Sequence, residues 1–167
     1  TNVASDMTAS AISHGGVGGT VNLRDATTGV PAKSLYTGAP YYNTDNYRYL
    51  LFTLAPTTTT KTFKASSISF DSRVTSLNGP DTIELWGTMP GGSATLWGST
   101  TIDLSDSENP IGTNWNGYSM GVNMSLASTG TVSFMLLARV TDTNHLVSNQ
   151  NANWYIDNLI VSGYVLD

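Results

Sequence analysis

The chain has 167 residues, and because a chain of this length buries roughly 70% of its unfolded surface, it can form one independent core. It contains no cysteine, which excludes disulfides, a thiol nucleophile and a thiolate metal site. Only 11% of the residues are charged and the formal net charge is -5, so the seven scattered Lys and Arg residues provide no basic face, and we expect no nucleic-acid partner. No apolar run approaches about eighteen residues, and we expect no membrane insertion.

Period-two alternation is common along the chain and helical periodicity is almost absent, which predicts an all-β fold of about nine short strands. A shorter strand or two is expected before Arg24. The other expected strands are 48–54, 67–74, 82–89, 94–104, 118–126, 132–140 and 154–164, separated by Gly, Pro, Asn or Ser clusters. Residues 25–46 are expected to form a long irregular loop, and loops of that length are often functional.

Two tryptophans stand out on neighbouring strands. Ile83 and Leu85 alternate with Glu84 and Trp86, so an inward aliphatic pair places Trp86 on the outer face of the sheet. The same parity on the next strand places Trp97 outward. A four-residue turn at 90–93 would then pair Trp86 with Trp97, Glu84 with Ser99 and Leu85 with Gly98.

Two adjacent outward indoles would form a flat platform of the kind on which sugar rings stack. A structural alternative stays open, in which the pair packs beneath a loop or braces the sheet as a cross-strand aromatic pair. Polar groups on outer faces could add hydrogen bonds to a bound sugar, and the candidates are Arg73, Glu84 and Arg139. A salt bridge between an arginine and Asp71 or Glu84 is an equally open alternative. Trp115 and Tyr118 are expected to form a cluster at a loop edge, which could extend the sugar-binding surface into a groove.

The sequence contains no strong catalytic motif. His14 and His145 lack a Ser-His-Asp or metal-ligand spacing, and neither G-x-S-x-G nor H-E-x-x-H occurs. Two enzyme arrangements remain open: a lyase that unites His145, Tyr155 and Arg139, and a glycosidase that pairs Glu84 with Asp71. We therefore expect a domain that binds and does not catalyse, and that requires no cofactor.

A structural Ca²⁺ is a separate expectation. Asp157 near the end of the chain, with Asp25 or Asp6 from the beginning, could supply the hard oxygen ligands that Ca²⁺ prefers. The alternative is that Asp157 is an edge residue hydrogen-bonded to the backbone.

Six short runs of residues stand out together: residues 4–10, Gly15-Gly16, residues 66–73, Gly79-Pro80, Leu85-Trp86 and residues 154–163. These runs resemble a jelly-roll-like domain that recurs in secreted bacterial proteins. The Ile-Asp-Asn at 156–158 is also similar to the ending of β-sandwich carbohydrate-binding modules. The resemblance implies a secreted domain of two antiparallel sheets. It also implies a non-catalytic module that sits beside a hydrolase or lyase, and such modules often carry a structural calcium. Asp157 matches the terminal-strand acid of that pattern, and Asp71 and Arg73 match a recurrent pair.

The sequence therefore predicts a single β-sandwich domain over 1–167, a module of a larger protein that is secreted or attached to a bacterial cell surface. We expect a monomer that binds a polysaccharide through Trp86 and Trp97, with a catalytic domain covalently linked to it. The alternative function is a structural or adhesive module with a protein partner.

Overall fold

The computed structural model describes residues 3–16, 21–24, 34–40, 47–74, 80–102, 115–124, 127–139, 141 and 151–167. Their regular structure is entirely β. The strands are β1 (Met7–Ala9), β2 (Ser13–Gly16), β3 (Val21–Arg24), β4 (Ser34–Pro40), β5 (Tyr47–Pro56), β6 (Thr62–Val74), β7 (Thr82–Thr88), β8 (Thr95–Thr101), β9 (Asn116–Gly121), β10 (Val132–Arg139) and β11 (Asn151–Leu166). The all-β prediction is confirmed. No helix in these ranges is long and apolar enough to cross a bilayer.

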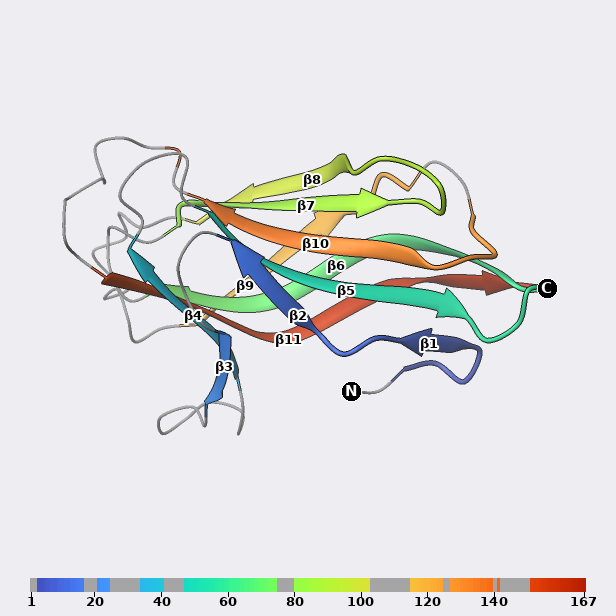
Figure 1. The fold of residues 1–167 in the computed structure, drawn as a ribbon, viewed down its shortest axis with the longest axis horizontal. Helices are drawn as coiled ribbons and strands as arrows, with labels where there is room; N and C mark the ends of the chain where they lie inside the picture. The colour runs from blue at the N-terminus through green and yellow to red at the C-terminus, as the bar shows by residue number, and fades with distance from the viewer. Residues whose placement is uncertain are drawn as a thin grey trace.

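The described strands form two antiparallel sheets, one of six strands and one of five, packed as a sandwich (Figure 1). Sheet A has the order β1-β5-β10-β7-β8, with β2 also paired to β5, and sheet B has the order β3-β4-β11-β6-β9. From β5 onward the chain passes repeatedly between the sheets, with only β7 and β8 joined as a hairpin within one sheet. This exchange is the connectivity of a jelly roll, and the predicted β-sandwich is confirmed.

The core lies between the sheets and follows the alternation that the sequence predicts. On β10, Val132, Phe134, Leu136 and Ala138 are fully buried, while the residues between them are only partly buried. The rings of Phe52 and Phe134 stack at 5.3 Å with an interplanar angle of 5°. Strands β6, β7 and β10 therefore contribute one apolar face to the core and leave a second face outside, where binding residues can lie.

Strand β4 corrects one prediction. Its residues fall inside the stretch 25–46, which we expected to be an irregular loop, yet Ser34–Pro40 pair with β3 on one side and with β11 on the other. Pro40 stands at the last position of the strand, where its missing N–H interrupts no further pairing. Residues 25–33 and 41–46 of the expected loop lie outside the described ranges.

A β-bulge divides the hairpin of β7 and β8. Glu84 pairs with Ser99 and Leu85 with Gly98, as predicted, but the register then shifts so that Trp86 pairs with Leu96. Trp97 is the extra residue. Because a bulge inserts one residue into one strand only, it reverses the alternation of every position on the turn side. The predicted four-residue turn with Trp86 opposite Trp97 is therefore wrong.

Candidate functional site

Trp86, Glu84 and Arg139 form one connected group on the outer face of sheet A. The indole Nε1 of Trp86 donates a hydrogen bond to Glu84 Oε2 at 2.8 Å. The guanidinium of Arg139 donates from Nη1 to Glu84 Oε1 at 3.0 Å, and the same contact is an ion pair. The Glu84 side chain is 14% exposed and that of Arg139 is 37% exposed. The carboxylate thus fixes the indole and the guanidinium at once, and the predicted alternative of a salt bridge at Glu84 is confirmed.

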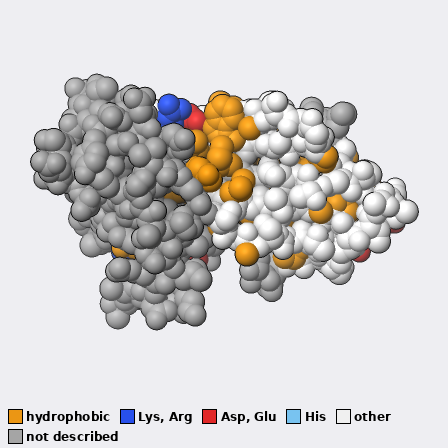
Figure 2. Space-filling model, in the orientation of Figure 1, with side chains coloured by type: hydrophobic (Ala, Val, Ile, Leu, Met, Phe, Trp, Pro, Cys, Tyr) orange, Lys and Arg blue, Asp and Glu red, His pale blue; other side chains and the backbone are white. Residues whose placement is uncertain are grey.

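A row of apolar residues runs across the neighbouring strands and passes through Trp86. Strand register places Met135 of β10 beside Trp86 on one side and Leu96 of β8 on the other, and Leu51 of β5 continues the row beyond Met135. Leu96 is 49% exposed, although it is a large hydrophobic residue. Figure 2 shows a band of hydrophobic side chains across the middle of the face that it views, with a basic and an acidic side chain at its border. The outer face of sheet A therefore carries an indole within a strip of apolar side chains. We give the name Trp86 platform to Trp86 together with Glu84, Arg139, Met135 and Leu96.

Trp97 is not part of this platform. It is only 8% exposed and belongs to the core, where its ring meets the Phe134 ring edge-on with centroids 5.5 Å apart. The ring occupies the space that a Cβ on Gly87 would need, so Gly87 makes room for it. The prediction that Trp97 faces outward is wrong because the bulge turns its side chain inward and turns Leu96 outward in exchange.

Arg73 and Trp115 lie on the other side of the sandwich, on the outer face of sheet B. The guanidinium carbon of Arg73 is 4.4 Å from the Tyr155 ring centroid and 5.5 Å from that of Trp115. The two rings meet edge-to-face at 6.3 Å. We name these three residues the Arg73 cluster. The core separates it from the Trp86 platform, so the structure does not bring Arg73 to the site proposed from the sequence.

Tyr118 points away from Trp115, although the two were expected to form one loop-edge group. Its ring stacks on Phe70, a core residue, at 5.8 Å with an interplanar angle of 25°. Trp115 and Tyr118 are three positions apart along an extended segment, so the two side chains take opposite faces of the sheet. Tyr118 therefore packs on the inner side of sheet B and lines neither outer face.

Asp157 stands on the same outer face as the Arg73 cluster, directly opposite Asp71. Its Oδ1 accepts a hydrogen bond from the backbone N–H of Asn158 at 2.8 Å, and the Asn158 side chain donates from Nδ2 to Asp71 Oδ2 at 2.6 Å. Asn158 has a φ of 48°, a left-handed conformation that asparagine tolerates, at a bulge in β11.

The described ranges contain no group of three or more His, Cys, Asp or Glu residues that could hold a metal ion. Asp25 lies outside those ranges. A calcium ion shared by Asp157 and Asp25 therefore stays a prediction, and the backbone contact at Asp157 is the alternative that the sequence left open.

The two enzyme arrangements that the sequence left open do not assemble on this fold. Glu84 lies on the outer face of sheet A and Asp71 on that of sheet B, and packed sheets lie about 10 Å apart. Both carboxyls point away from the core, so their separation exceeds the roughly 5 to 9.5 Å of glycosidase carboxyl pairs. Arg139 and Tyr155 are divided in the same way, and His145 lies outside the described residues.

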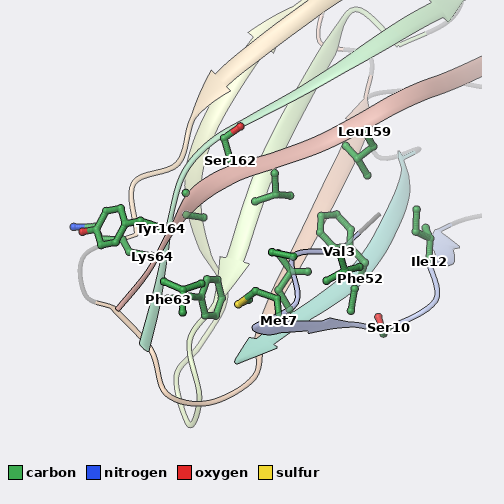
Figure 3. A pocket seen from close by; sticks show the side chains of 17 residues that line it. Val3, Met7, Ser10, Ile12, Phe52, Phe63, Lys64, Leu159, Ser162 and Tyr164 are labelled. Atoms are coloured by element: carbon green, nitrogen blue, oxygen red, sulfur yellow. The ribbon is translucent and has the colours of Figure 1, made fainter. Parts of the chain in front are cut away.

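An apolar cavity of about 380 Å³ opens between β1 and the second half of β11, away from both outer faces. Figure 3 shows Val3, Met7, Phe52 and Phe63 gathered across it, while Lys64 and Tyr164 lie at its rim. None of the seven binding residues expected from the sequence lines it. Its lining offers few hydrogen-bonding groups, so it does not suit a ligand rich in hydroxyls.

Tyr155 is the functional candidate that sequence reasoning placed wrongly. The signal was present in the alternation of β11, where Trp154 and Ile156 are buried and Tyr155 and Asp157 are only partly buried. Parity along this strand predicts that Tyr155 shares a face with Asp157. Its contact with Arg73 depends on the pairing of β11 with β6, which the sequence does not show.

Comparisons with known proteins find similarity at the level of the fold. No family model matches the chain, and no curated protein matches it. The chain superposes with a TM-score of 0.57 on a non-crystalline cellulose-specific carbohydrate-binding module, CBM28, at 13% identity, covering 86% of this chain and 80% of that one. A carbohydrate-binding module of the β-sandwich superfamily gives a TM-score of 0.51 at 13% identity, covering 96% of this chain and 58% of that one.

A third similar structure is the K1 cleaved adhesin domain of Lys-gingipain from Porphyromonas gingivalis W83. It gives a TM-score of 0.52 at 9% identity and covers 95% of this chain and 98% of that one. The chain therefore has the β-sandwich fold of carbohydrate-binding modules, and the resemblance stated from the sequence is confirmed for the fold.

Proposed function

We propose that this chain is a non-catalytic carbohydrate-binding module that docks on an extracellular polysaccharide through the Trp86 platform. The observation that carries the proposal is the indole of Trp86, which is held on an outer sheet face by Glu84 and Arg139 and is flanked by the exposed Leu96. Similarity to β-sandwich carbohydrate-binding modules supports the proposal through the fold. A fixed aromatic ring loses little conformational entropy when a sugar stacks on it.

Each residue of the platform has a role in this proposal. Trp86 gives the apolar surface for the C–H face of a sugar ring, and Met135 and Leu96 extend that surface along the row. Glu84 already accepts one hydrogen bond at each oxygen, so it orients the indole. Arg139 keeps further N–H donors at the border of the strip, which sugar hydroxyls can use.

The proposed biological effect is targeting. Binding to a repetitive polymer raises the local concentration of a covalently linked catalytic domain at its substrate, with no chemistry in this chain. The proposal places the module outside a bacterial cell, as a monomer. Incubating the domain with candidate polysaccharides should yield no new reducing or unsaturated ends, and their appearance would show that it is an enzyme.

Affinity gel electrophoresis tests the proposal. Gels containing hydroxyethylcellulose, xylan or mixed-linkage β-glucan should retard the native chain in at least one case. Trp86→Ala should abolish the retardation. Tyr164→Ala is the matched control, because Tyr164 is a 49%-exposed aromatic residue at the cavity rim and lies away from the platform. Native mobility in every gel, or equal retardation of Trp86→Ala, would reject the site.

The second candidate is an adhesive module with a protein partner. The similarity to the adhesin domain of Lys-gingipain favours it, as does the aliphatic character of the row around Trp86. A protein partner would bury Leu96 and Met135 as well as the indole. Leu96→Asp should then abolish partner binding in a cell-surface pull-down, whereas sugar retardation should persist, weakened at most several-fold.

A further inference from the structure

The outer face of sheet B contains unsatisfied polar atoms. Within the described residues, three buried side-chain polar atoms have no hydrogen-bond partner: Arg73 Nε, Trp115 Nε1 and Asp157 Oδ2. Almost all buried polar groups in native proteins are paired, because an unpaired one costs free energy. The three atoms come from three strands or segments that meet on a single sheet face. Their concentration on one face indicates a site that a ligand completes.

Arg73 is the cation of this face. Two aromatic rings hold its guanidinium, at 4.4 Å from the Tyr155 centroid and 5.5 Å from the Trp115 centroid. Lys61 and Arg139 each form an ion pair with a carboxylate, whereas Arg73 forms none with any residue in the described part of the chain. The side-chain Nε of Arg73 also has no hydrogen-bond acceptor there. A positioned guanidinium without an acidic partner is a receptor for a planar oxyanion, which accepts two parallel hydrogen bonds from it.

Two carboxylates and a glycine lie next to this cation. Along β6, Asp71 is two residues from Arg73, so the two side chains share a face at about 7 Å spacing. Asp71 pairs across the sheet with Gly117 on one side and with Asp157 on the other. Gly117 is exposed and has no side chain, and a Cβ there would contact Asp71 Oδ1 at 3.5 Å. The Arg73 cluster therefore lies beside a row that contains the side-chain-free Gly117 and the carboxylates of Asp71 and Asp157.

The positions of the unpaired donors and the unpaired acceptor on this face indicate the chemistry of the ligand. Donors without acceptors stand in the row of Arg73 and Trp115, and an acceptor without a donor, Asp157 Oδ2, stands in the next row. A ligand that satisfies both presents an oxyanion to the first row and a hydroxyl to the second, about one sugar ring away. Asp71 and Asp157 would repel a polymer with many negative charges per unit, which favours a single carboxylate over multiple sulfates.

We propose that the outer face of sheet B is a second binding site, distinct from the Trp86 platform, that takes a uronic acid unit of an acidic polysaccharide. The sugar carboxylate pairs with Arg73 and accepts from the Trp115 indole, and a ring hydroxyl donates to Asp157. The Tyr155 ring forms the apolar border of the site. The site depends on none of the platform residues, because the core of the sandwich lies between the two faces.

The test uses pairs of polymers that differ only in charge. Polygalacturonate and alginate are each compared with their esterified forms in affinity gels. The native chain should be retarded by at least one polyuronate and not by its ester. Arg73→Gln should weaken binding about 10- to 100-fold, the range for a lost charge-assisted hydrogen bond. Failure of both polyuronates to retard the native chain, or equal retardation by the ester, would overturn the proposal.

Three further variants and one further polymer test whether the retardation comes from this face of the sandwich. Trp115→Phe keeps an aromatic ring beside Arg73 and removes only the Nε1 donor, so it should weaken polyuronate binding several-fold while the fold is kept. Asp157→Ala should give a similar loss. Trp86→Ala should leave polyuronate binding unchanged, even if it abolishes binding to neutral polysaccharides. Stronger retardation by dextran sulfate than by either polyuronate would contradict the carboxylate assignment.

Discussion

The two outer faces of this sandwich both carry a tryptophan, an arginine and at least one carboxylate, yet their polar groups are paired in opposite ways. On the Trp86 platform the indole N–H and the guanidinium both donate to Glu84. In the Arg73 cluster the indole N–H of Trp115 and Nε of Arg73 donate to nothing. The first arrangement holds an aromatic ring in place by itself. The second is incomplete until a ligand supplies the missing acceptor.

This difference teaches that similar residue types can give different specificities. A face whose polar groups are mutually paired offers mainly the surface of a ring, which suits stacking by a neutral sugar. A face with unpaired donors selects for the charge and geometry of the group that pairs with them. Substitutions on each face and in the core between them probe this contrast, beginning with the largest expected effect.

We expect the largest loss of stability from substitution of Trp97, whose side chain the bulge turns from the outer face of sheet A into the core. Trp97→Ala empties a core site beside Phe134 and should lower the free energy of unfolding by about 3 to 5 kcal/mol. Trp86→Ala, on the partly exposed side, should cost less than about 1.5 kcal/mol. Urea denaturation measures both values. Equal losses at the two positions would mean that the bulge does not exist in solution.

The paired network of the platform gives the next effect. Glu84→Ala leaves the Trp86 N–H and the Arg139 guanidinium without their shared acceptor, and should cost about 1 to 3 kcal/mol of unfolding free energy. Glu84→Gln keeps a carbonyl oxygen as an acceptor and should lose less. The same denaturation experiment reports both. A Glu84→Ala variant as stable as the native chain would show that the network does not fix the indole.

A matched pair of indole substitutions contrasts a donor that is paired with one that is not. Trp154 Nε1 donates to Ser72 Oγ at 3.0 Å in the core, so Trp154→Phe loses a hydrogen bond and leaves a gap in the packing. It should cost about 1 to 3 kcal/mol. Trp115→Phe removes an unpaired donor and should leave stability unchanged or raise it by up to about 1 kcal/mol. Destabilisation by Trp115→Phe equal to that by Trp154→Phe would mean that the Trp115 N–H has a hydrogen-bond acceptor in solution.

The smallest effect concerns an ion pair that belongs to neither face. The hydrogen bond from Lys61 to Asp6, 3.0 Å away, raises the pKa of Lys61 above its usual 10.5, with a further contribution from Asp167. The stabilisation is therefore fully present below pH 10.5 and is lost as the pH rises through the raised pKa. The stability difference between the native chain and Lys61→Gln should shrink over that interval. A constant difference would mean that the ion pair does not form. Lys61→Gln should not change sugar binding.

The alternation of apolar and polar residues alone predicts most of the fold and the outward position of several residues of the Trp86 platform. It placed Glu84, Trp86 and Arg139 on outer faces and Ile83, Leu85 and Phe134 in the core. These positions follow from the two-residue period of a strand, which is a local property.

The rest depends on contacts that the sequence does not display. At the bulge the Trp97 ring enters the core in the space that Gly87 leaves free. Strict alternation of inward and outward residues does not predict such a bulge. The Arg73 cluster requires β6 to lie beside both β9 and β11, and the sequence places Trp115 and Tyr155 far from Arg73. Strand order is a long-range property of the chain.

The most direct measurement uses the fluorescence of Trp86 itself. The chain has four tryptophans, of which Trp97 and Trp154 are buried, so in a Trp115→Phe background Trp86 is the one partly exposed indole. Titration of this variant with oligosaccharides of the neutral polysaccharide that retards the native chain should change its emission with saturation. The change should vanish when Trp86→Phe is added. Binding that leaves the emission of the single variant unaltered, or a change that survives the second substitution, would contradict a sugar stacked on Trp86.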